Sequence, residues 1–122
     1  MDVITLGDHV WDRPEIQAYL RDNARIIRPA NFPDGAPGLG WTVAVSAAGV
    51  KIGVINLLGR TFMRYNVECP FRILDKALAE IREQTSLTVV DMHAETTSEK
   101  VAMGHYADGK VSVVFGTHTH IQ

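Results

Sequence analysis

Leu87-Thr88-Val89-Val90-Asp91-Met92-His93-Ala94-Glu95 is the stretch of sequence that decides the fold. Residues 87–90 are apolar and β-prone enough to form a buried strand, which runs directly into Asp91-Met92-His93. Before this strand, an apolar stripe at helical spacing predicts a helix that opens at Pro70. After it, the capping pattern from Thr96 to Glu99 predicts a second helix. Strands that alternate with helices are typical of an α/β fold with a partly parallel sheet.

Further strands are expected outside this stretch, at residues 3–6, 25–28, 41–45, 50–57 and 111–115. The first of them is β-rich and stopped by Gly7, which predicts a short buried strand. Residues 47–49 turn between the two middle strands and predict a β-hairpin. Asp12 and Pro14 predict the start of a helix that the Asp12 carboxylate caps. The three prolines and three glycines of residues 29–40 exclude regular structure from that segment.

The composition limits the class of protein. The chain has 122 residues, of which 46% are hydrophobic and 21% charged, as expected for one globular domain. A formal net charge of -2 offers no basic surface for nucleic acid, although a small nucleotide remains a suitable partner. A single cysteine, Cys69, favours a reducing compartment and excludes a cysteine zinc cage. Because no signal-peptide pattern and no apolar run of ~20 residues is present, we expect a cytoplasmic protein that does not enter a membrane.

Four of the five histidines follow the end of an expected strand, and these are His9, His93, His118 and His120. In open α/β sheets, ligands bind at the edge where the strands end. We therefore expect these imidazoles to gather at one edge of the sheet. Asp8, beside His9, adds an oxygen ligand, whereas His105 lies on an expected helix and is interpreted as a surface residue.

The spacing of these residues favours metal binding, although each motif has a simpler interpretation. In an extended segment, His118 and His120 point to the same side and could hold one metal ion or two adjacent ions, or else they are two polar loop residues. Asp91, His93 and Glu95 share one face in the same way, and at the end of a buried strand they need partners or a metal to offset desolvation.

The segment Gly7-Asp8-His9, taken alone, is more typical of a turn beside a helix than of a ligand site. Three separate strand ends that carry such residues nevertheless favour a pair of divalent ions that would hold a phosphoryl group. Patterns for a P-loop, a dinucleotide site, a zinc protease and a serine hydrolase are absent from the sequence. Arg28 and Arg60 could bind phosphate or form structural ion pairs. Trp11 and Trp41 are interpreted as packing residues.

Five segments occur in an order that resembles the YmdB-like metallophosphoesterases, a family of 2′,3′-cyclic-nucleotide 2′-phosphodiesterases. They are residues 7–12, 28–33, 54–60, 91–100 and 116–120. The blocks H-A-E-T-T-S-E-K, from His93, and G-T-H-T-H, from Gly116, are the most specific. The resemblance implies an α/β fold of the calcineurin-like αββα sandwich type. It also implies two divalent metal ions (iron or manganese, with zinc or magnesium as alternatives) and a small cyclic nucleotide as substrate.

The resemblance also implies roles for individual residues. Asp8 stands where the family has an asparagine ligand, and it would bind the same ion as His93 and His118. His120 would bind the second ion. A hydroxide held between the ions would attack phosphorus, and His9 would be the general acid that protonates the leaving ribose oxygen. Glu95 and Glu99 are interpreted as supporting or capping groups rather than ligands.

Chains of this family extend beyond both ends of the sequence. We therefore expect residues 1–122 to form a partial metallophosphoesterase domain that lacks an N-terminal metal-ligand segment, which carries the bridging carboxylate, and a C-terminal segment. One weakly held ion is then expected, and open strand edges at residues 3–6 and 111–115 favour a homo-oligomer. The alternative function is a catalytically inactive remnant that acts as a metal- or nucleotide-binding or oligomerisation module.

Overall fold

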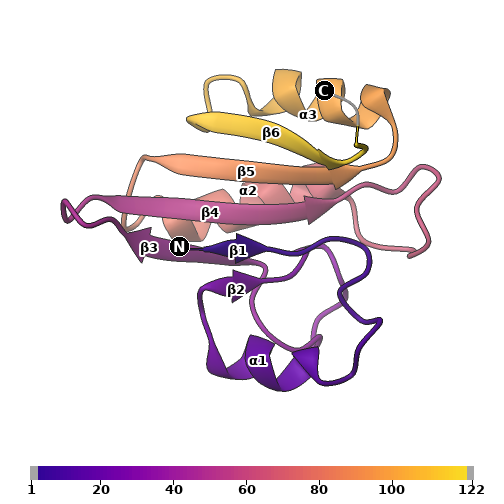
Figure 1. Ribbon diagram of the computed structural model, residues 1–122. Coiled ribbons are helices and arrows are strands. Elements are labelled where there is room, and N and C mark those ends of the chain that lie inside the picture. Colours follow the sequence, from indigo (N-terminus) through magenta and orange to yellow (C-terminus); the bar gives the residue numbers. More distant parts are fainter. Residues whose placement is uncertain (1–2, 121–122) are drawn as a thin grey trace.

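The computed structural model describes residues 3–120, which form two sheets and three helices (Figure 1). The strands are β1 (Ile4–Thr5), β2 (Ile26–Ile27), β3 (Trp41–Val45), β4 (Lys51–Leu58), β5 (Thr88–Ala94) and β6 (Val113–His118). The helices are α1 (Ile16–Asp22), α2 (Pro70–Ile81) and α3 (Thr97–Ala107). The predicted α/β class is confirmed as a mixed α/β fold.

The larger sheet has the strand order β3-β4-β5-β6. β3 and β4 form the predicted antiparallel hairpin, whereas β4, β5 and β6 run parallel to one another. α2 connects β4 to β5, and α3 connects β5 to β6, as parallel neighbours require. Because β4, β5 and β6 are parallel, their C-terminal ends lie at one edge, where Leu58 is opposite His93 and Ala94 is opposite His118.

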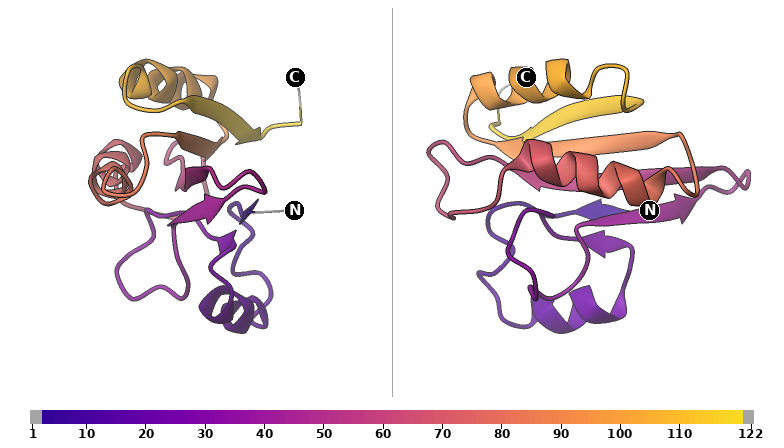
Figure 2. Two further views of the ribbon diagram at one scale, coloured as in Figure 1. Left: turned by 90° about the vertical axis from the view of Figure 1, so that its left-hand side faces the viewer. Right: turned by 180° about the vertical axis from the view of Figure 1, so that it is seen from behind.

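Both longer helices cover the same face of this sheet (Figure 2). α2 begins with Pro70 in its first turn and buries the predicted stripe, of which Leu74, Leu78 and Ile81 are at most 2% exposed. α3 begins with the predicted capping box, since the Thr96 side chain accepts a hydrogen bond from the backbone N–H of Glu99. Side chains from alternate positions of β4 and β5 complete this hydrophobic core.

The N-terminal part forms a second unit beside β3 and β4, in which β1 and β2 pair in parallel (Figure 1). A separate apolar cluster holds it together, with Val10, Leu20, Phe32, Leu58 and Val67 buried at its centre. Asn56 of β4 links the two units because its Nδ2 atom donates to the carbonyl oxygens of Leu6 and Ile27. This link brings the chain that follows β1 close to the C-terminal ends of β4 and β5.

The first strand and the first helix differ from the sequence prediction. β1 comprises only Ile4–Thr5, pairs with β2 outside the larger sheet and leaves Ile4 39% exposed, so the expected buried strand at residues 3–6 is wrong. The helix begins at Ile16 rather than at Asp12. The Asp12 carboxylate instead contacts His9 and Arg64, and these tertiary partners take the place of the predicted cap.

Two strands extend further than their apolar residues predicted. β5 continues to Ala94, and β6 begins at Val113 and continues to His118. β5 continues through its polar residues because it pairs with a strand on each side. Asp91, for example, lies between Asn56 of β4 and Phe115 of β6, so its backbone remains part of the sheet. Polar side chains at the end of β5 are therefore held by a regular strand rather than by a loop.

In the part of the chain that the structure describes, the face of the larger sheet away from α2 and α3 carries no helix (Figure 2). On β6, Val114 packs toward the helix-covered core, so Val113 and Phe115 point to the opposite face, where they are 50% and 41% exposed. β6 is also an edge strand, as expected for residues 111–115. Within residues 3–120, every helix is too short or too polar to cross a lipid bilayer.

Candidate metal site at the carboxyl edge of the sheet

Three side chains from distant parts of the chain meet at the C-terminal ends of the parallel strands. Asp8 follows β1, His93 lies on β5 and His118 ends β6. Nε2 of His93 is 2.9 Å from Oδ1 of Asp8, and Nδ1 of His118 is 3.2 Å from Nε2 of His93. One ligand atom from each residue lies within 4.8 Å of the other two. The structure thus brings together three of the four residues expected to bind metal.

The backbone of β6 aims His118 at this group. Its φ angle is 90°, a left-handed conformation that residues other than glycine rarely adopt and that costs about 1–3 kcal/mol. Nε2 of His118 lies 2.7 Å from Oε2 of Glu95, which leaves Nδ1 directed at Asp8, 3.4 Å from its Oδ1. Glu95 is therefore a supporting group for His118, as its position in the sequence suggested.

Asp8 provides the negative charge of the group. Its side chain is buried, and the residue is 6% exposed. Burial raises the pKa of Asp8, but the hydrogen bond from His93 and the positive charges of His9 and His118 outweigh burial, so the pKa lies below its usual value. The carboxylate is thus ionised near neutral pH and can accept hydrogen bonds or bind a cation.

His93 has a partner at each ring nitrogen. Its Nε2 faces Asp8, and its Nδ1 lies 2.9 Å from Oγ1 of Thr117. The Thr117 hydroxyl in turn donates to Oδ1 of Asp91 at 2.6 Å, and Asp91 is only 2% exposed. The sequence analysis assigned no role to Thr117. The signal it could have used is register, because Thr117 is opposite His93 in the β5–β6 ladder.

His9 lies at the open side of the group, and its side chain is 73% exposed. Its Nδ1 is 2.7 Å from Oδ2 of Asp12, while its Nε2 is 3.9 Å from Oδ2 of Asp8. Arg64 pairs with the second oxygen of Asp12 at 3.0 Å. The hydrogen bond from His9, with a contribution from the charge of Arg64, holds the pKa of Asp12 below its usual value. Sequence reasoning missed Arg64, which lies 55 residues from His9.

A cavity of about 760 Å³ opens over these residues. It is lined by Asp8, His9, His93, Glu95, Gly116, Thr117, His118, Thr119 and His120. His120 is exposed and lies outside the three-residue group. The expected alternation of His118 and His120 does not apply, because the backbone at His118 is left-handed rather than extended. Binding of a second ion by His120 stays a prediction.

Arg28 does not contribute to this site. Its guanidinium donates to the carbonyl oxygens of four loop residues, Pro29, Ala36, Pro37 and Gly38, and the residue is 8% exposed. The suggestion that Arg28 binds phosphate is therefore wrong, because its donors already hold residues 29–40 in place. Arg60 is exposed, and its backbone N–H donates to Oε2 of Glu99, which confirms Glu99 as a supporting group.

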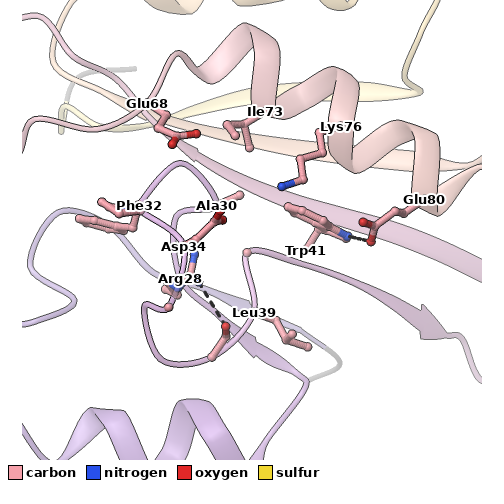
Figure 3. Close-up of a pocket in the computed structure, with 14 residues that line it drawn as sticks. Arg28, Ala30, Phe32, Asp34, Leu39, Trp41, Glu68, Ile73, Lys76 and Glu80 are labelled. Atoms are coloured by element: carbon pink, nitrogen blue, oxygen red, sulfur yellow. Dashed lines mark hydrogen bonds between the residues drawn. The ribbon is translucent and has the colours of Figure 1, made fainter.

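Figure 3 shows a second cavity, of about 220 Å³, between residues 28–41 and α2. Trp41 lines it and donates from Nε1 to Oε2 of Glu80 at 3.1 Å. Trp11 packs edge-on against Phe32 with 5.4 Å between ring centroids. Both tryptophans are thus engaged in packing, as predicted. His105 is exposed on α3, as expected for a surface residue.

The donor set of the group fits a divalent transition-metal ion. One carboxylate oxygen and two imidazole nitrogens are typical ligands of zinc, manganese and iron. Three protein ligands beside an open cavity are also typical of catalytic rather than structural sites, because they leave a coordination position for water or substrate. Within residues 3–120, this is the one group of three potential ligands found at such close range.

Comparison with known proteins places the chain in a family. The family described as "YmdB-like protein" matches residues 1–122. The 2′,3′-cyclic-nucleotide 2′-phosphodiesterase of Bacillus subtilis (strain 168) is 49% identical over 121 residues, which cover 99% of this chain and 45% of that protein. The chain therefore spans less than half the length of this curated relative.

Two crystal structures are similar in both sequence and fold. A protein from Thermus thermophilus superposes with a TM-score of 0.89 at 41% identity, over 99% of this chain and 46% of that one. A phosphatase from Mycoplasma pneumoniae superposes with a TM-score of 0.83 at 32% identity, over 98% of this chain and 43% of that one. With a family match over its full length, this chain belongs to the YmdB-like protein family.

Proposed function

We propose that the chain forms part of a metal-dependent phosphodiesterase that hydrolyses small cyclic nucleotides. The observation that carries the proposal is the cluster of Asp8, His93 and His118 at the wall of a cavity that also contains His9. The names of the relatives support phosphoester chemistry, since one is a cyclic-nucleotide phosphodiesterase and another a phosphatase. The roles proposed for individual residues rest on the geometry of the site.

Asp8, His93 and His118 would hold one divalent ion, and we propose His120 as a ligand for a second. Iron and manganese suit the mixed oxygen and nitrogen donors, with zinc and magnesium as alternatives. When bound, such ions lower the pKa of coordinated water and stabilise negative charge on a phosphoryl group. The ionised carboxylate of Asp8 favours any of these cations, because its depressed pKa keeps it charged near neutral pH.

His9 is proposed as the general acid. The 2.7 Å contact with Asp12 orients the imidazole through Nδ1 and leaves Nε2 at the cavity, where it can carry a proton to the leaving oxygen. Arg64 pairs with the other carboxylate oxygen of Asp12 and so compensates the negative charge of Asp12. Asp12 thus positions His9, a role that resembles that of the aspartate in a catalytic triad.

A small nucleotide suits the cavity better than a polymer. Its volume of about 760 Å³ lies in the range of roughly 300–1,000 Å³ that is usual for small-molecule sites. A formal net charge of -2 gives no general attraction for a polynucleotide. The printed name of the Bacillus subtilis relative supports a 2′,3′-cyclic nucleotide as the substrate. We also propose a cytoplasmic location, in keeping with the single cysteine.

The calcineurin-like αββα sandwich is proposed as the fold of the whole protein. Two observations support it: α2 and α3 cover one face of the larger sheet, and the opposite face bears the exposed apolar side chains of Val113 and Phe115. In a sandwich, that opposite face packs against a second sheet. In this arrangement the site at the carboxyl edge would lie between the two sheets.

The proposed activity is tested by hydrolysis of 2′,3′-cyclic AMP and of a chromogenic bis-phosphodiester with added Mn²⁺. We expect turnover by the protein that contains this chain, and we expect the turnover to disappear with a chelator. His9→Ala should lower turnover by about 10²- to 10⁴-fold without loss of metal binding. His105→Ala is the matched control, because His105 is exposed on α3 away from the cavity, and it should not change turnover. Equal turnover by wild type and His9→Ala would contradict the role of His9.

A second candidate function is an inactive module that binds metal or nucleotide and associates with other copies. The single three-residue group within residues 3–120 and the apolar edge strand β6 favour it. Calorimetry with Mn²⁺ separates the two proposals, because two tightly bound ions per chain would contradict the inactive module. A homo-oligomer, measured by light scattering, together with absent turnover, would support it.

A further inference from the structure

A groove lined by aromatic side chains lies in the N-terminal unit, apart from the metal group. Trp11, Phe32 and Tyr65 line this groove of about 520 Å³, which we call the aromatic groove. Phe32 is buried, whereas Trp11 and Tyr65 are half-buried and keep part of their ring surface open. Both stand nearly perpendicular to Phe32, at interplanar angles of 71° and 75°. Packing against Phe32 therefore holds the two rings in place without using all of their surface.

The chemistry of the aromatic groove suits a flat aromatic ligand. Pro33 and Pro37 add apolar surface, while Gln17 and Asp34 supply polar atoms beside the rings. Bases of nucleotides stack on tyrosine and tryptophan, because every base has a flat π-face. A side-chain amide and a carboxylate can pair with the ring nitrogens and the amino group of a base. The groove thus offers both kinds of contact that a nucleobase makes.

One side chain connects the aromatic groove with the proposed general acid. Nη1 of Arg64 lies 3.3 Å from Nδ1 of His9, and Cζ of Arg64 lies 5.1 Å from the ring centroid of Tyr65, within the range of a cation–π contact. Arg64 does not line the groove, so its guanidinium covers the side of Tyr65 towards His9 and leaves the groove side open. His9 in turn lines the cavity over the metal group. A single guanidinium therefore bridges the two sites.

We propose that the aromatic groove binds the nucleobase of the substrate, with Tyr65 and Trp11 as the stacking residues. The assignment rests on the cyclic-nucleotide function proposed for the chain. A nucleotide carries its base and its phosphate on different carbons of one ribose, so two sites separated by one side chain suit it. Binding of a part of the substrate that does not react helps to orient the part that does. The groove supplies this contact, which the metal group lacks.

Two substitutions of Tyr65 separate the effect of its ring from the effect of its bulk. Tyr65→Phe keeps the stacking surface, whereas Tyr65→Leu keeps apolar volume and removes the ring. Tyr19→Leu is the matched control, because Tyr19 is 64% exposed on α1 and does not line the groove. All three variants are made in the protein that contains this chain, and thermal unfolding checks that each one is folded.

The first measurement is calorimetric titration with adenosine in the presence of a chelator, so that neither phosphate nor metal contributes. We expect binding by wild type, Tyr65→Phe and Tyr19→Leu, and binding about 5- to 150-fold weaker by Tyr65→Leu, as is typical when a stacking ring is removed. Adenosine that fails to bind wild type, or binds Tyr65→Leu equally well, would overturn the inference. Light scattering that shows an oligomer dissociated by Tyr65→Leu, without adenosine binding, would instead assign the groove to a second copy.

The second measurement compares hydrolysis of 2′,3′-cyclic AMP with that of ribose 2′,3′-cyclic phosphate, which has no base, in the presence of Mn²⁺. Tyr65→Leu should raise KM for the nucleotide by the same factor and leave kcat/KM for the base-free diester unchanged. If turnover of both falls equally, Tyr65 acts through Arg64 on His9, and the inference is wrong while the proposed function stands. If wild type hydrolyses neither, the proposed function fails, and the adenosine titration decides whether the groove binds a base.

Crystals of the wild-type protein soaked with adenosine test the inference without any substitution. We expect the adenine ring to lie in the aromatic groove against Tyr65 and Trp11. An adenine ring bound only outside the groove would overturn the inference, whatever the effect of the Tyr65 variants on catalysis.

Discussion

The imidazole of His93 lies directly against the Cα atom of Gly7. A Cβ atom built on Gly7 would stand 2.3 Å from Cε1 and 2.5 Å from Nε2 of His93, far inside van der Waals contact. Glycine at this position therefore lets the chain that follows β1 approach the end of β5 closely enough for Asp8 to reach His93. This close contact is the physical reason for a glycine directly before Asp8, because any side chain at position 7 would clash with the His93 ring.

Gly7→Ala should disrupt the metal group. The added methyl must displace the His93 ring, so we expect metal affinity to fall at least about 10-fold, the cost typical of misplaced ligands. Calorimetry with Zn²⁺ measures the change. Gly104→Ala is the control, because Gly104 is exposed on α3 with open space around its Cα. That variant should bind normally and gain up to about 1 kcal/mol of stability from helix propensity. Unchanged affinity in Gly7→Ala would contradict the close approach.

The left-handed backbone at His118 should lower the free energy of unfolding of the chain. His118→Ala and His118→Gly both remove the imidazole, but only glycine adopts a φ of 90° without strain. We expect the glycine variant to be more stable than the alanine variant by about 1 kcal/mol. Chemical denaturation of the two metal-free variants checks this difference. If alanine is the more stable of the two, the strain assigned to His118 is absent.

Asp75 should make stability depend on pH at the acid end. A hydrogen bond from Tyr106, assisted by Lys110, lowers the pKa of Asp75 in the folded chain. A carboxylate whose pKa is lower in the folded than in the unfolded chain stabilises the fold at pH values above its unfolded-state pKa. This stabilisation is lost as the pH falls through the folded-state pKa. Asp75→Asn should therefore be less stable than wild type at pH 7, by no more than about 1 kcal/mol for so exposed a pair.

The difference in stability between Asp75→Asn and wild type should vanish in acid, at pH values below the pKa of Asp75 in the folded chain. Thermal unfolding at several pH values measures it, and Tyr106→Phe, which removes the donor, should show the same trend. A stability difference between Asp75→Asn and wild type that persists unchanged into strong acid would mean that the aspartate acts through packing rather than charge.

Asn31 is expected to be essential for stability. It is fully buried, and its amide bridges the end of β4 to the following loop: Nδ2 donates to the carbonyl oxygens of Leu58 and Glu68, and Oδ1 accepts from the N–H of Leu58. Asn31→Ala leaves these groups buried without partners and should cost about 2–4 kcal/mol. Asn66→Ala, at an exposed position in the same loop, should change stability by less than about 0.5 kcal/mol. Denaturant titration of both variants tests the prediction.

Local patterns were sufficient to predict the elements of the larger sheet. α2 follows from its helical apolar stripe, α3 from the capping box at Thr96, and the β3–β4 hairpin from two β-prone runs around a turn. The meeting of Asp8, His93 and His118 could be anticipated because strands in parallel end at one edge. In each case the information lies within a few residues or in the general geometry of α/β sheets.

Features that depend on contacts between distant residues could not be predicted. The capping pattern at Asp12 failed because the carboxylate contacts His9 and Arg64 instead, and Arg64 lies far along the chain. The contact between Thr117 and His93 depends on their register, which is set by the pairing of β5 with β6 rather than by any local motif. For Arg28 the sequence left phosphate binding and a structural ion pair open, whereas in the fold its guanidinium donates to the carbonyl oxygens of four loop residues.

The most direct test of the account is anomalous diffraction at the zinc absorption edge from crystals of the chain grown with Zn²⁺. We predict a strong peak bonded to Oδ1 of Asp8, Nε2 of His93 and Nδ1 of His118 at about 2.0–2.2 Å. The same crystals of His93→Ala should lack this peak. Wild-type crystals with no zinc between these three atoms, or with zinc bound only elsewhere on the surface, would contradict the central claim that the end of the sheet is a metal site.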